Sequence, residues 1–299
     1  MKLFVVDAGG TDIKYCTMDD SLAIENHAYI PTPQDSLDNF IETIRQIYSP
    51  FRNETEGIAL SLPGFIDTQN GTHNGGGGPV YMQHQPIGAL LSEKCGCPVH
   101  LENDGKAAAI AEMKAGSLSD ITNGAVMILG TAVGGGLIIN KQILRGKHFT
   151  AGEFSFLVTN DTEWSNISSF GTFKCSTRAL LGMYRSMKNT EETIDGREFF
   201  ARLDQDEDAQ KALKKYARYI SILIYNLGMM LDIEKVAIGG GISNQPVLLE
   251  TIHREIEELK ASYPPRHRGM SAVFPEVCCC RFLSGSNLIG AYLSYKYNL

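Results

Sequence analysis

The sequence has no long hydrophobic run, no excess of basic residues and no regular pairing of cysteines. No apolar stretch approaches the ~20 residues that a helix needs to cross a bilayer, and Asp7 interrupts the N-terminal segment too early for a signal peptide. There are 27 Lys and Arg residues against 34 Asp and Glu, a net charge of −7. Nucleic-acid binding depends on clustered Lys and Arg, so we expect a cytoplasmic protein with no nucleic-acid or membrane partner.

The seven cysteines fit neither a disulfide framework nor a metal site. Their number is odd, Cys16 and Cys175 are isolated, and residues 278–280 are three adjacent cysteines. Cys95 and Cys97 form a C-x-C pair, but no second Cys or His pair stands at metal-ligand spacing. We therefore predict reduced thiols that pack as small hydrophobic side chains, and no zinc.

The composition indicates a folded α/β protein. The 299 residues, of which 43% are hydrophobic, suffice for two lobes or one large unit. Buried strands are predicted at 3–6, 13–18, 58–62, 98–101, 125–129, 137–140 and 235–238, and helices at 36–48, 107–115, 209–231, from about 246, and at the C-terminal end. Segments 160–176 and 186–208 are polar and receive no assignment.

A strand, a Gly/Thr hairpin and a returning strand occur twice, around residues 7–12 and 130–136. This repeat predicts two related α/β lobes, each with a glycine hairpin facing a shared cleft. We place the N-terminal lobe at 1–118 and the C-terminal lobe at 119–285. The terminal helix, 286–299, is expected to pack on the N-terminal lobe.

Three glycine clusters, each directly after a buried strand, indicate phosphate binding, although a glycine turn can serve only to supply a positive φ. Glycines let backbone N–H groups approach a phosphate, and Thr11 and Thr131 add hydroxyl groups to the two hairpins. The third cluster, 239–241, is placed to support a nucleoside. The sequence has neither a P-loop nor the dinucleotide-binding G-x-G-x-x-G after its first strand. If the chain binds a nucleotide, we therefore expect it to do so with a fold other than the P-loop or the dinucleotide-binding fold.

Six motifs in order give the chain a resemblance to the ROK family of sugar kinases and sugar-responsive repressors. They are residues 7–14 (D-x-G-G-T-x-x-K), 62–67 (containing P-G-x-[IV]-D), 102–108 (E-N-D-x-x-A-A), 129–136 (the second phosphate loop), 151–154 (A-G-E-[FL]) and 239–243 (the adenosine loop). The resemblance implies two actin-like (ribonuclease H-like) lobes with an interlobe cleft, and binding of ATP and Mg²⁺. It also implies a homodimer.

The resemblance further implies roles for individual residues. Asp104 becomes the catalytic base, and Gly64, Asn103, Asp104 and Glu153 become sugar-binding residues. The cofactor-binding residues are Gly9, Gly10, Thr11, Lys14, Gly130, Thr131, Gly134, Gly135, Gly239, Gly240 and Gly241, and Asp7 holds Mg²⁺ through water.

Each of these side chains also has an ordinary structural interpretation. Asp104 can be a helix N-cap, Asn103 an exposed turn amide, and Glu153 a surface acid. Asp7 can cap a turn, and Lys14 can point outward from a strand. The sequence leaves these alternatives open.

The chain departs from the ROK pattern at the zinc site. Members of the family commonly follow A-G-E-[FL] with G-H and a cysteine-rich zinc loop, whereas this chain has Ser155, Phe156 and the single Cys175. It is therefore similar to the zinc-less branch that includes β-glucoside kinases. The missing zinc motif weakens the expectation that this chain has the glucose specificity of glucokinases.

The activity implied is ATP-dependent phosphorylation of a hexose or β-glucoside, at the 6-hydroxyl. A sugar-sensing protein without catalysis is the main alternative, although Asp104 and both phosphate loops are retained. A ROK repressor is disfavoured because too few residues precede Asp7 for a helix-turn-helix module. A nicotinamide oxidoreductase lacks its fingerprint.

Overall fold

The computed structural model describes residues 1–158, 170–264 and 274–299 and divides into two compact units. Unit 1 consists of Met1–Lys114, Ile143–Ala151 and Gly285–Leu299, and unit 2 consists of Ala115–Gln142 and Gly152–Ser284. Residues 143–151, which the sequence analysis assigned to the C-terminal lobe, therefore group with unit 1. Of the polar segment 160–176, residues 160–169 lie outside the described residues.

Unit 1 is built on a five-stranded sheet with the order β3-β2-β1-β4-β7. The strands are β1 (Leu3–Ala8), β2 (Asp12–Met18), β3 (Glu25–Pro31), β4 (Ile58–Leu62) and β7 (Val99–Asn103). Strand β1 pairs antiparallel with β2 and parallel with β4, which in turn pairs parallel with β7. All of β1 and β4 is buried, as their continuous apolar sequences predict. A small sheet of β5 (Ile66–Asp67) and β6 (Thr72–His73) lies beyond β4 in the chain.

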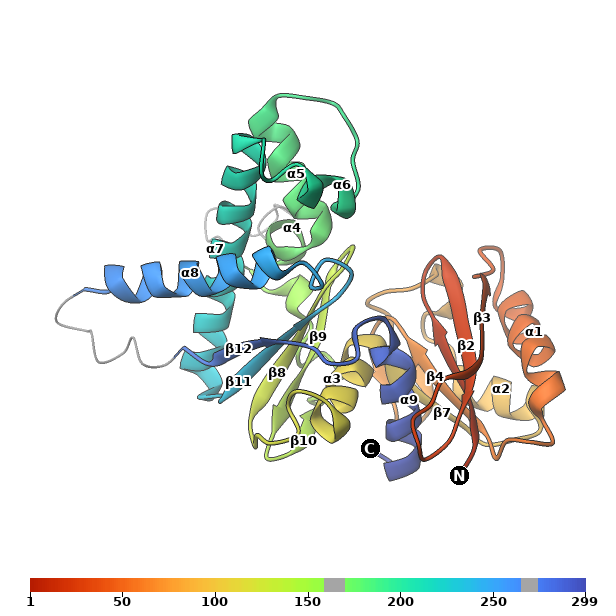
Figure 1. Cartoon of the computed structure of the whole chain (residues 1–299). Coiled ribbons are helices and arrows are strands. Elements are labelled where there is room, and N and C mark those ends of the chain that lie inside the picture. Colours follow the sequence, from red (N-terminus) through yellow and green to blue (C-terminus); the bar gives the residue numbers. More distant parts are fainter. Residues whose placement is uncertain (159–169, 265–273) are drawn as a thin grey trace. The chain divides into compact units, whose positions relative to one another are not determined.

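Helices cover both faces of this sheet (Figure 1). α1 (Leu37–Tyr48) and α2 (Ile87–Cys95) share one core cluster with Phe4 and Val6 of β1. α9 (Ser286–Tyr297) lies on the opposite face, against β1, β4 and β7, and α3 (Asp104–Ala115) packs beside it. Both chain termini belong to unit 1.

Unit 2 repeats the same arrangement, with a sheet of order β10-β9-β8-β11-β12. Its strands are β8 (Gly124–Leu129), β9 (Val133–Ile139), β10 (Gln142–Leu144, which ends in unit 1), β11 (Lys235–Gly239) and β12 (Glu276–Cys279). An antiparallel hairpin, β8–β9, is again followed by parallel pairing, β8–β11 and β11–β12. The predicted repeat of two related α/β lobes is confirmed.

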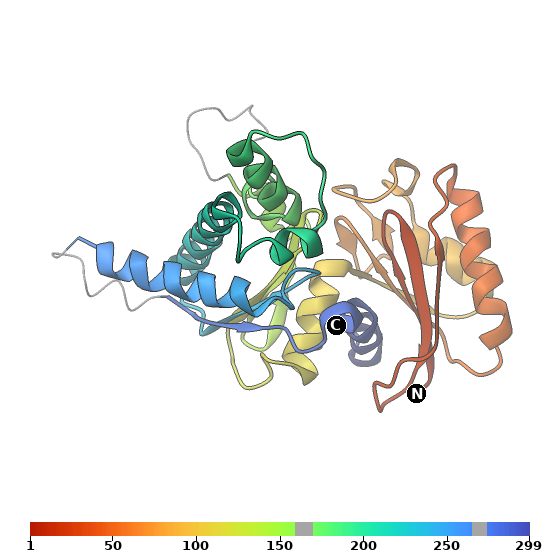
Figure 2. The ribbon, with the colours of Figure 1, turned by 45° about the horizontal axis from the view of Figure 1, so that its top comes forward.

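The helices of unit 2 are α4 (Thr172–Cys175), α5 (Thr177–Lys188), α6 (Gly196–Ala201), α7 (Glu207–Leu231) and α8 (Pro246–Ser262). α7 packs between α5 and α8, and Figures 1 and 2 show α7 and α8 side by side. The sequence analysis predicted α7 and α8 but made no assignment for α5 and α6. No helix of the described residues is long and apolar enough to cross a membrane.

Gly290 permits the close contact between α9 and α3, which yields a first prediction. A Cβ at this position would lie 1.7 Å from the carbonyl oxygen of Ala107. Gly290→Ala must therefore push the helices apart, and we expect it to lower the free energy of unfolding by about 1–3 kcal/mol or more. Urea denaturation measures the loss.

The matched control is Gly182→Ala in α5, where nothing lies within 4 Å of the added Cβ. This control should be neutral or stabilise the protein by about 0.5–1 kcal/mol, because alanine favours helix over glycine. Equal destabilisation by both substitutions would contradict the close-packing explanation.

Candidate functional site

The hairpin between β1 and β2 presents unpaired backbone donors. The carbonyl oxygens of Gly9 and Gly10 accept hydrogen bonds from Thr32 Oγ1 (2.8 Å) and Gln34 Nε2 (2.9 Å). Among the described residues, the N–H groups of Gly10 and Thr11 have no acceptor. Successive free N–H groups of this kind form an anion-binding concavity.

The hairpin between β8 and β9 has the same organisation in unit 2. Gly130 donates its N–H to the carbonyl of Ala132 (3.0 Å) and accepts from the N–H of Thr177 (2.8 Å). Within the part of the chain that the structure describes, the N–H groups of Thr131 and Ala132 lack an acceptor. In both hairpins the first glycine is held by hydrogen bonds and the next two N–H groups have no acceptor among the described residues, although the two sequences are not the same.

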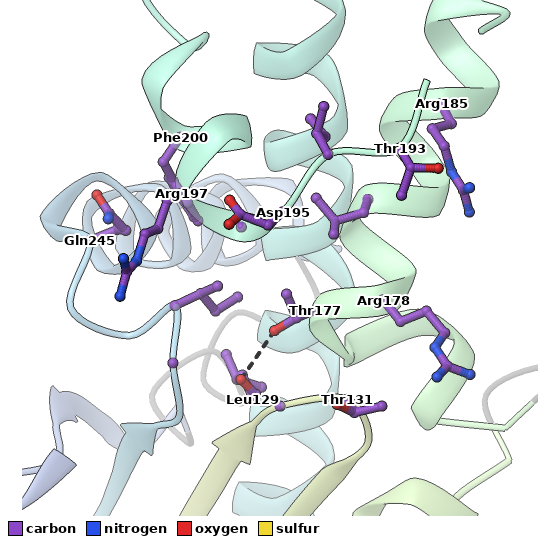
Figure 3. A pocket seen from close by; sticks show the side chains of 16 residues that line it. Leu129, Thr131, Thr177, Arg178, Arg185, Thr193, Asp195, Arg197, Phe200 and Gln245 are labelled. Atoms are coloured by element: carbon purple, nitrogen blue, oxygen red, sulfur yellow. Dashed lines mark hydrogen bonds between the residues drawn. The ribbon is translucent and has the colours of Figure 1, made fainter. Parts of the chain in front are cut away.

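A pocket of about 590 Å³ opens beside the second hairpin (Figure 3). Its lining comprises Leu129, Gly130, Thr131, Thr177, Arg178, Leu181, Arg185, Thr193, Ile194, Asp195, Gly196, Arg197, Phe200, Gly241, Ile242 and Gln245. Gly240, at φ +101°, makes the turn into the pocket, and a Cβ there would lie 2.4 Å from the carbonyl oxygen of Leu129. Gly130, Thr131 and Gly241 therefore line one pocket, and nucleotide binding by them stays a prediction.

Four other predicted cofactor residues of unit 2 do not line this pocket. A Cβ on Gly135 would lie 2.2 Å from the carbonyl oxygen of Val126, and one on Gly239 would lie 2.7 Å from Ile128 Cδ1. Gly134 lies opposite Ile128 in the β8–β9 pair. Gly135, Gly239 and Gly240 are thus required for close packing around the pocket, and direct ligand contact by these four glycines stays a prediction.

Much of the pocket comes from α5, α6 and the segment between them, which sequence reasoning missed. One signal was available. Asp195 and Glu198 form a capping box at the start of α6, with Asp195 accepting from the N–H of Glu198 (2.9 Å). The D-x-x-E spacing is a known helix-start signature.

Asp7 lies at the carboxyl end of β1. Its Oδ1 accepts hydrogen bonds from Ser61 Oγ (2.9 Å) and Asn287 Nδ2 (3.2 Å), and Lys14 is its partner across the β1–β2 pair. Burial raises the pKa of this carboxyl, although Ser61, Asn287 and the charge of Lys14 oppose the shift. Oδ2 has no hydrogen-bond partner among the described residues. A carboxylate that is costly to bury and has an unused oxygen suits a hydrated cation.

Sequence reasoning missed both side chains that hold Asp7. The contact of Ser61 with Asp7 follows from the register of β1 and β4, in which the two residues are partners. Asn287 comes from α9, and nothing in the sequence indicated its contact with β1.

Asn103 and Asp104 stand at the junction of β7 and α3. Asn103 is the N-cap, because its Oδ1 accepts from the N–H of Lys106 (2.9 Å). Its Nδ2 donates to the carbonyl of Gly64 (2.8 Å) and to Asp104 Oδ1 (3.1 Å), and that oxygen also accepts from the N–H of Gly105 (2.7 Å). Asp104 is therefore the first helical residue, and its interpretation as the N-cap is wrong. Asn103 is buried and is no exposed turn amide.

His73 fixes a loop of four glycines, residues 75–78, next to Gly64. Its Nδ1 accepts from the N–H of Gly75 (3.1 Å), so Nε2 carries the proton and donates to the carbonyl of Pro63 (2.9 Å). Burial lowers the pKa of His73, which favours this neutral form. Gly64 has φ +99°, and a Cβ there would lie 2.6 Å from the carbonyl oxygen of Gly75. Together these contacts fix the Gly64 turn beside Asn103.

Glu102 connects the junction of β7 and α3 to two distant parts of unit 1. Its side chain, 1% exposed, accepts at Oε1 from the N–H of Asn103 (3.0 Å) and at Oε2 from Ser294 Oγ (2.9 Å). Oε2 also forms an ion pair with Arg145. Ser294 Oγ in turn lies 2.9 Å from His100 Nε2. The sequence analysis included Glu102 in a motif but gave no role to Arg145.

Glu153 belongs to unit 2, whereas Gly64, Asn103 and Asp104 are brought together in unit 1. It precedes a short 3₁₀ turn, Phe154–Phe156. Ser155 Oγ accepts from the N–H of Val133 (2.8 Å) and donates to its carbonyl (3.0 Å), which fixes this turn to β9. The sugar contact predicted for Glu153 stays a prediction.

The thiol of Cys175 is poorly suited to metal binding. It is fully buried, and burial raises its pKa to about 12, which disfavours the thiolate that zinc requires. In residues 1–158, 170–264 and 274–299, no three or more His, Cys, Asp or Glu side chains gather as metal ligands. Zinc independence remains a prediction.

A model described as the ROK family matches residues 3–292. This chain belongs to the ROK family. The membership agrees with the motif order and with the duplicated α/β sheet, and it confirms the resemblance inferred from the sequence.

The chain is similar to curated sugar kinases over most of its length. It is 26% identical to a β-glucoside kinase of Klebsiella pneumoniae, covering 86% of this chain and 87% of the relative. It is 27% identical to an N-acetyl-D-glucosamine kinase of Escherichia coli O139:H28, covering 95% and 96%.

Solved structures share the fold. A ROK family protein of Streptococcus pneumoniae TIGR4, in complex with sucrose, has a TM-score of 0.88 at 24% identity and covers 100% of this chain and 99% of that one. A ROK glucokinase of Streptomyces griseus, in complex with glucose and AMPPNP, has a TM-score of 0.81 at 21% identity, covering 97% and 98%. These likenesses confirm the predicted fold class.

The Glu102–Arg145 pair yields a second prediction. Arg145→Met leaves a buried carboxylate without its cation, and we expect the free energy of unfolding to fall by about 3–5 kcal/mol. Adding Glu102→Gln to this variant removes the unpaired buried charge and should recover part of the lost free energy of unfolding. A double-mutant cycle by urea denaturation measures the coupling.

The control is Arg45→Met, which breaks an exposed ion pair with Glu42. Its cost should be about 0–1 kcal/mol. If Arg145→Met cost no more than Arg45→Met, the buried pair would not hold unit 1 together.

Proposed function

We propose that this chain is an ATP-dependent sugar kinase that transfers the γ-phosphate to the 6-hydroxyl of a hexose or β-glucoside. The observation that carries the proposal is that each unit has a glycine hairpin with two free N–H groups, at Gly10 and Thr11 in unit 1 and at Thr131 and Ala132 in unit 2, and such groups suit phosphate oxygens. The names of the curated relatives support a kinase over a sensor without catalysis. The same resemblance supports a cytoplasmic homodimer.

The nucleoside of ATP is assigned to the 590 Å³ pocket of unit 2, a volume typical of small-ligand sites. Thr131 is assigned to the phosphate end of this pocket because it lies in the hairpin, and Gly241 leaves space for a ligand because nothing lies within 4 Å of its missing Cβ. Arg197 and Gln245 supply polar groups on one side of the pocket (Figure 3).

The sugar is assigned to Gly64, Asn103, Asp104 and Glu153. Both amide hydrogens of Asn103 are engaged by Gly64 and Asp104, and one lone pair of its Oδ1 is used by α3. The second lone pair remains, so Asn103 can only accept a hydrogen bond from a sugar hydroxyl.

Asp104 is proposed as the general base. Hydrogen bonds from Asn103 and Gly105 fix its carboxylate, and the N-terminus of α3 favours the ionised form. The hydroxyl proton passes to Asp104 while the hydroxyl oxygen bonds to the γ-phosphorus. The bond to the β–γ bridging oxygen breaks, and ADP leaves with its electron pair.

Asp7 would hold Mg²⁺ through water, with Ser61 and Asn287 fixing its orientation. When bound, Mg²⁺ neutralises charge on the phosphates. The residues present fit this role, because Asp7 has an oxygen without a hydrogen-bond partner among the described residues.

Asp104→Asn tests the proposed function. The cap of α3 is supplied by Asn103, so the variant should fold normally while its kcat falls by about 10²–10⁴-fold through loss of the base. ATP affinity should hardly change. A coupled ADP-release assay over a panel of hexoses and β-glucosides measures kcat. Calorimetry on the same protein measures the affinity for ATP. A folded variant with wild-type turnover, or a wild-type protein inactive on every sugar, would refute the proposal.

Gly10→Val tests the phosphate hairpin. Nothing lies within 4 Å of a Cβ at Gly10, and its φ is not positive, so the valine should be accommodated without strain. The side chain should nevertheless obstruct the approach of a phosphate to the backbone. Loss of one charge-assisted hydrogen bond predicts an ATP Kd weaker by about tenfold or more.

Sugar affinity and the melting temperature serve as internal controls for Gly10→Val. Both should remain at the wild-type value. Unchanged ATP affinity in this folded variant would remove the first hairpin from the ATP site.

A further inference from the structure

The first glycine hairpin is held from outside by the short segment that follows β3. Thr32 Oγ1 donates to the carbonyl oxygen of Gly9 (2.8 Å), and Gln34 Nε2 donates to that of Gly10 (2.9 Å). The same nitrogen of Gln34 also donates to the carbonyl of Thr32 (2.9 Å), so both of its amide hydrogens are used. The proposed function gives neither side chain a part in binding.

These two hydrogen bonds fix the direction of the N–H groups that follow them. A trans peptide unit is planar, so its carbonyl and its N–H point in opposite directions, and every peptide bond of the described residues is trans. The carbonyl of Gly9 belongs to the same peptide unit as the N–H of Gly10. The carbonyl of Gly10 belongs to the same unit as the N–H of Thr11. Thr32 therefore directs the first of these N–H groups, and Gln34 directs the second.

A glycine hairpin needs such bonds because glycine restricts its own backbone least. The peptide unit between Gly9 and Gly10 can turn over at little steric cost, which would reverse its N–H. Two backbone bonds close the turn, from the N–H of Gly9 to the carbonyl of Asp12 (2.9 Å) and from the N–H of Thr32 to the carbonyl of Thr11 (2.8 Å). Neither involves the two peptide units in question. The side chains of the segment are thus what holds these units in the described structure.

The segment that supplies the two side chains is itself well fixed. Pro31 and Pro33 flank Thr32, and each proline ring restricts φ to a narrow range. Tyr81 Oη donates to the carbonyl of Pro33 (2.5 Å), and the Tyr81 ring lies 6.4 Å from the ring of Phe40 in α1. Thr32 is 3% exposed, so water competes little for its hydroxyl. A hairpin held in this way does not have to be ordered when a ligand binds.

Unit 2 holds its own hairpin in a comparable way. Thr177, the first residue of α5, donates its N–H to the carbonyl of Gly130 (2.8 Å), which shares a peptide unit with the free N–H of Thr131. The hydroxyl of Thr177 donates to the carbonyl of Leu129 (3.2 Å; dashed line in Figure 3). A threonine outside the hairpin thus directs a free N–H in each unit, from the end of a strand in unit 1 and from the start of a helix in unit 2.

We propose that Thr32 and Gln34 are positioning residues for the phosphates of ATP, which act by directing the N–H groups of Gly10 and Thr11. This role rests on the proposed function, whereas the direction of the two N–H groups does not. Thr32 should contribute more than Gln34, because its hydrogen bond is partly buried and that of Gln34 is exposed to competing water.

Two near-isosteric variants test the proposal by calorimetric titration of ATP into the full chain. Thr32→Val removes the hydroxyl and keeps the branched side chain, and Gln34→Met removes both amide hydrogens and keeps an unbranched one. The Kd for ATP should weaken by about tenfold in the first and about threefold in the second. The Kd for adenosine and the KM for sugar should not change, because neither depends on this hairpin. Thr32→Ser restores the hydroxyl and should recover most of the ATP affinity.

Residual dipolar couplings measure the direction of the N–H bonds without any nucleotide. In Thr32→Val the coupling of the Gly10 N–H should change, and in Gln34→Met that of the Thr11 N–H should change. The couplings of the β1 amides should stay at their wild-type values, because the hairpin remains closed by its two backbone bonds.

The matched control is Thr17→Val. Thr17 is a fully buried residue of β2 whose hydroxyl accepts from Asn26 Nδ2 (2.9 Å), away from the hairpin. This variant loses a hydroxyl of the same kind as Thr32→Val does. It should alter neither the coupling of Gly10 nor the Kd for ATP.

Wild-type ATP affinity in both Thr32→Val and Gln34→Met would overturn the proposal and leave the proposed function standing. So would unchanged couplings at Gly10 and Thr11, an equal loss of ATP affinity in Thr17→Val, or parallel losses for ATP and adenosine. A wild-type protein that bound no ATP would refute the proposed function. The couplings would then decide alone whether the two side chains direct the N–H groups.

Discussion

The buried carboxylate of Glu102 is the constraint on which unit 1 depends. It receives the N–H of Asn103 at one oxygen, and Ser294 and Arg145 at the other. These partners come from three separate stretches of the chain, and removing any of them leaves charge or polarity without compensation. Because Asn103 also caps α3 and holds Gly64, the same carboxylate supports the orientation of Asp104.

The glycine hairpins provide the groups that can bind a ligand. In both units the first glycine of the turn is fixed by its own hydrogen bonds, and the next two N–H groups are left without an acceptor. Asp7 adds a carboxylate whose burial raises its pKa, an arrangement that costs stability unless a cation is near. Sites that carry such costs are where function is expected.

The sequence predicted the parts of the fold that depend on local patterns. Continuous apolar runs located β1, β4 and β8, and the period of α7 was visible because one of its faces is buried. The edge strand β3 was missed because most of its residues are exposed. α5 was missed because only Leu180 and Tyr184 of its residues are buried, so its sequence carries a weak core signal. Adjacent Asn103 and Asp104 both suit an N-cap, and only the backbone geometry chose between them.

The position of α9 has a consequence for biosynthesis. Unit 2 ends at Ser284, whereas unit 1 needs Gly285–Leu299 to cover its sheet, to fill the space at Ala107 and to supply Asn287 to Asp7. A ribosome adds about 5–20 residues per second, so unit 2 can complete its chain and fold while unit 1 still exposes one face. Unit 1 begins first and finishes last, and a nascent chain therefore cannot assemble the Asp7 site before its final helix emerges.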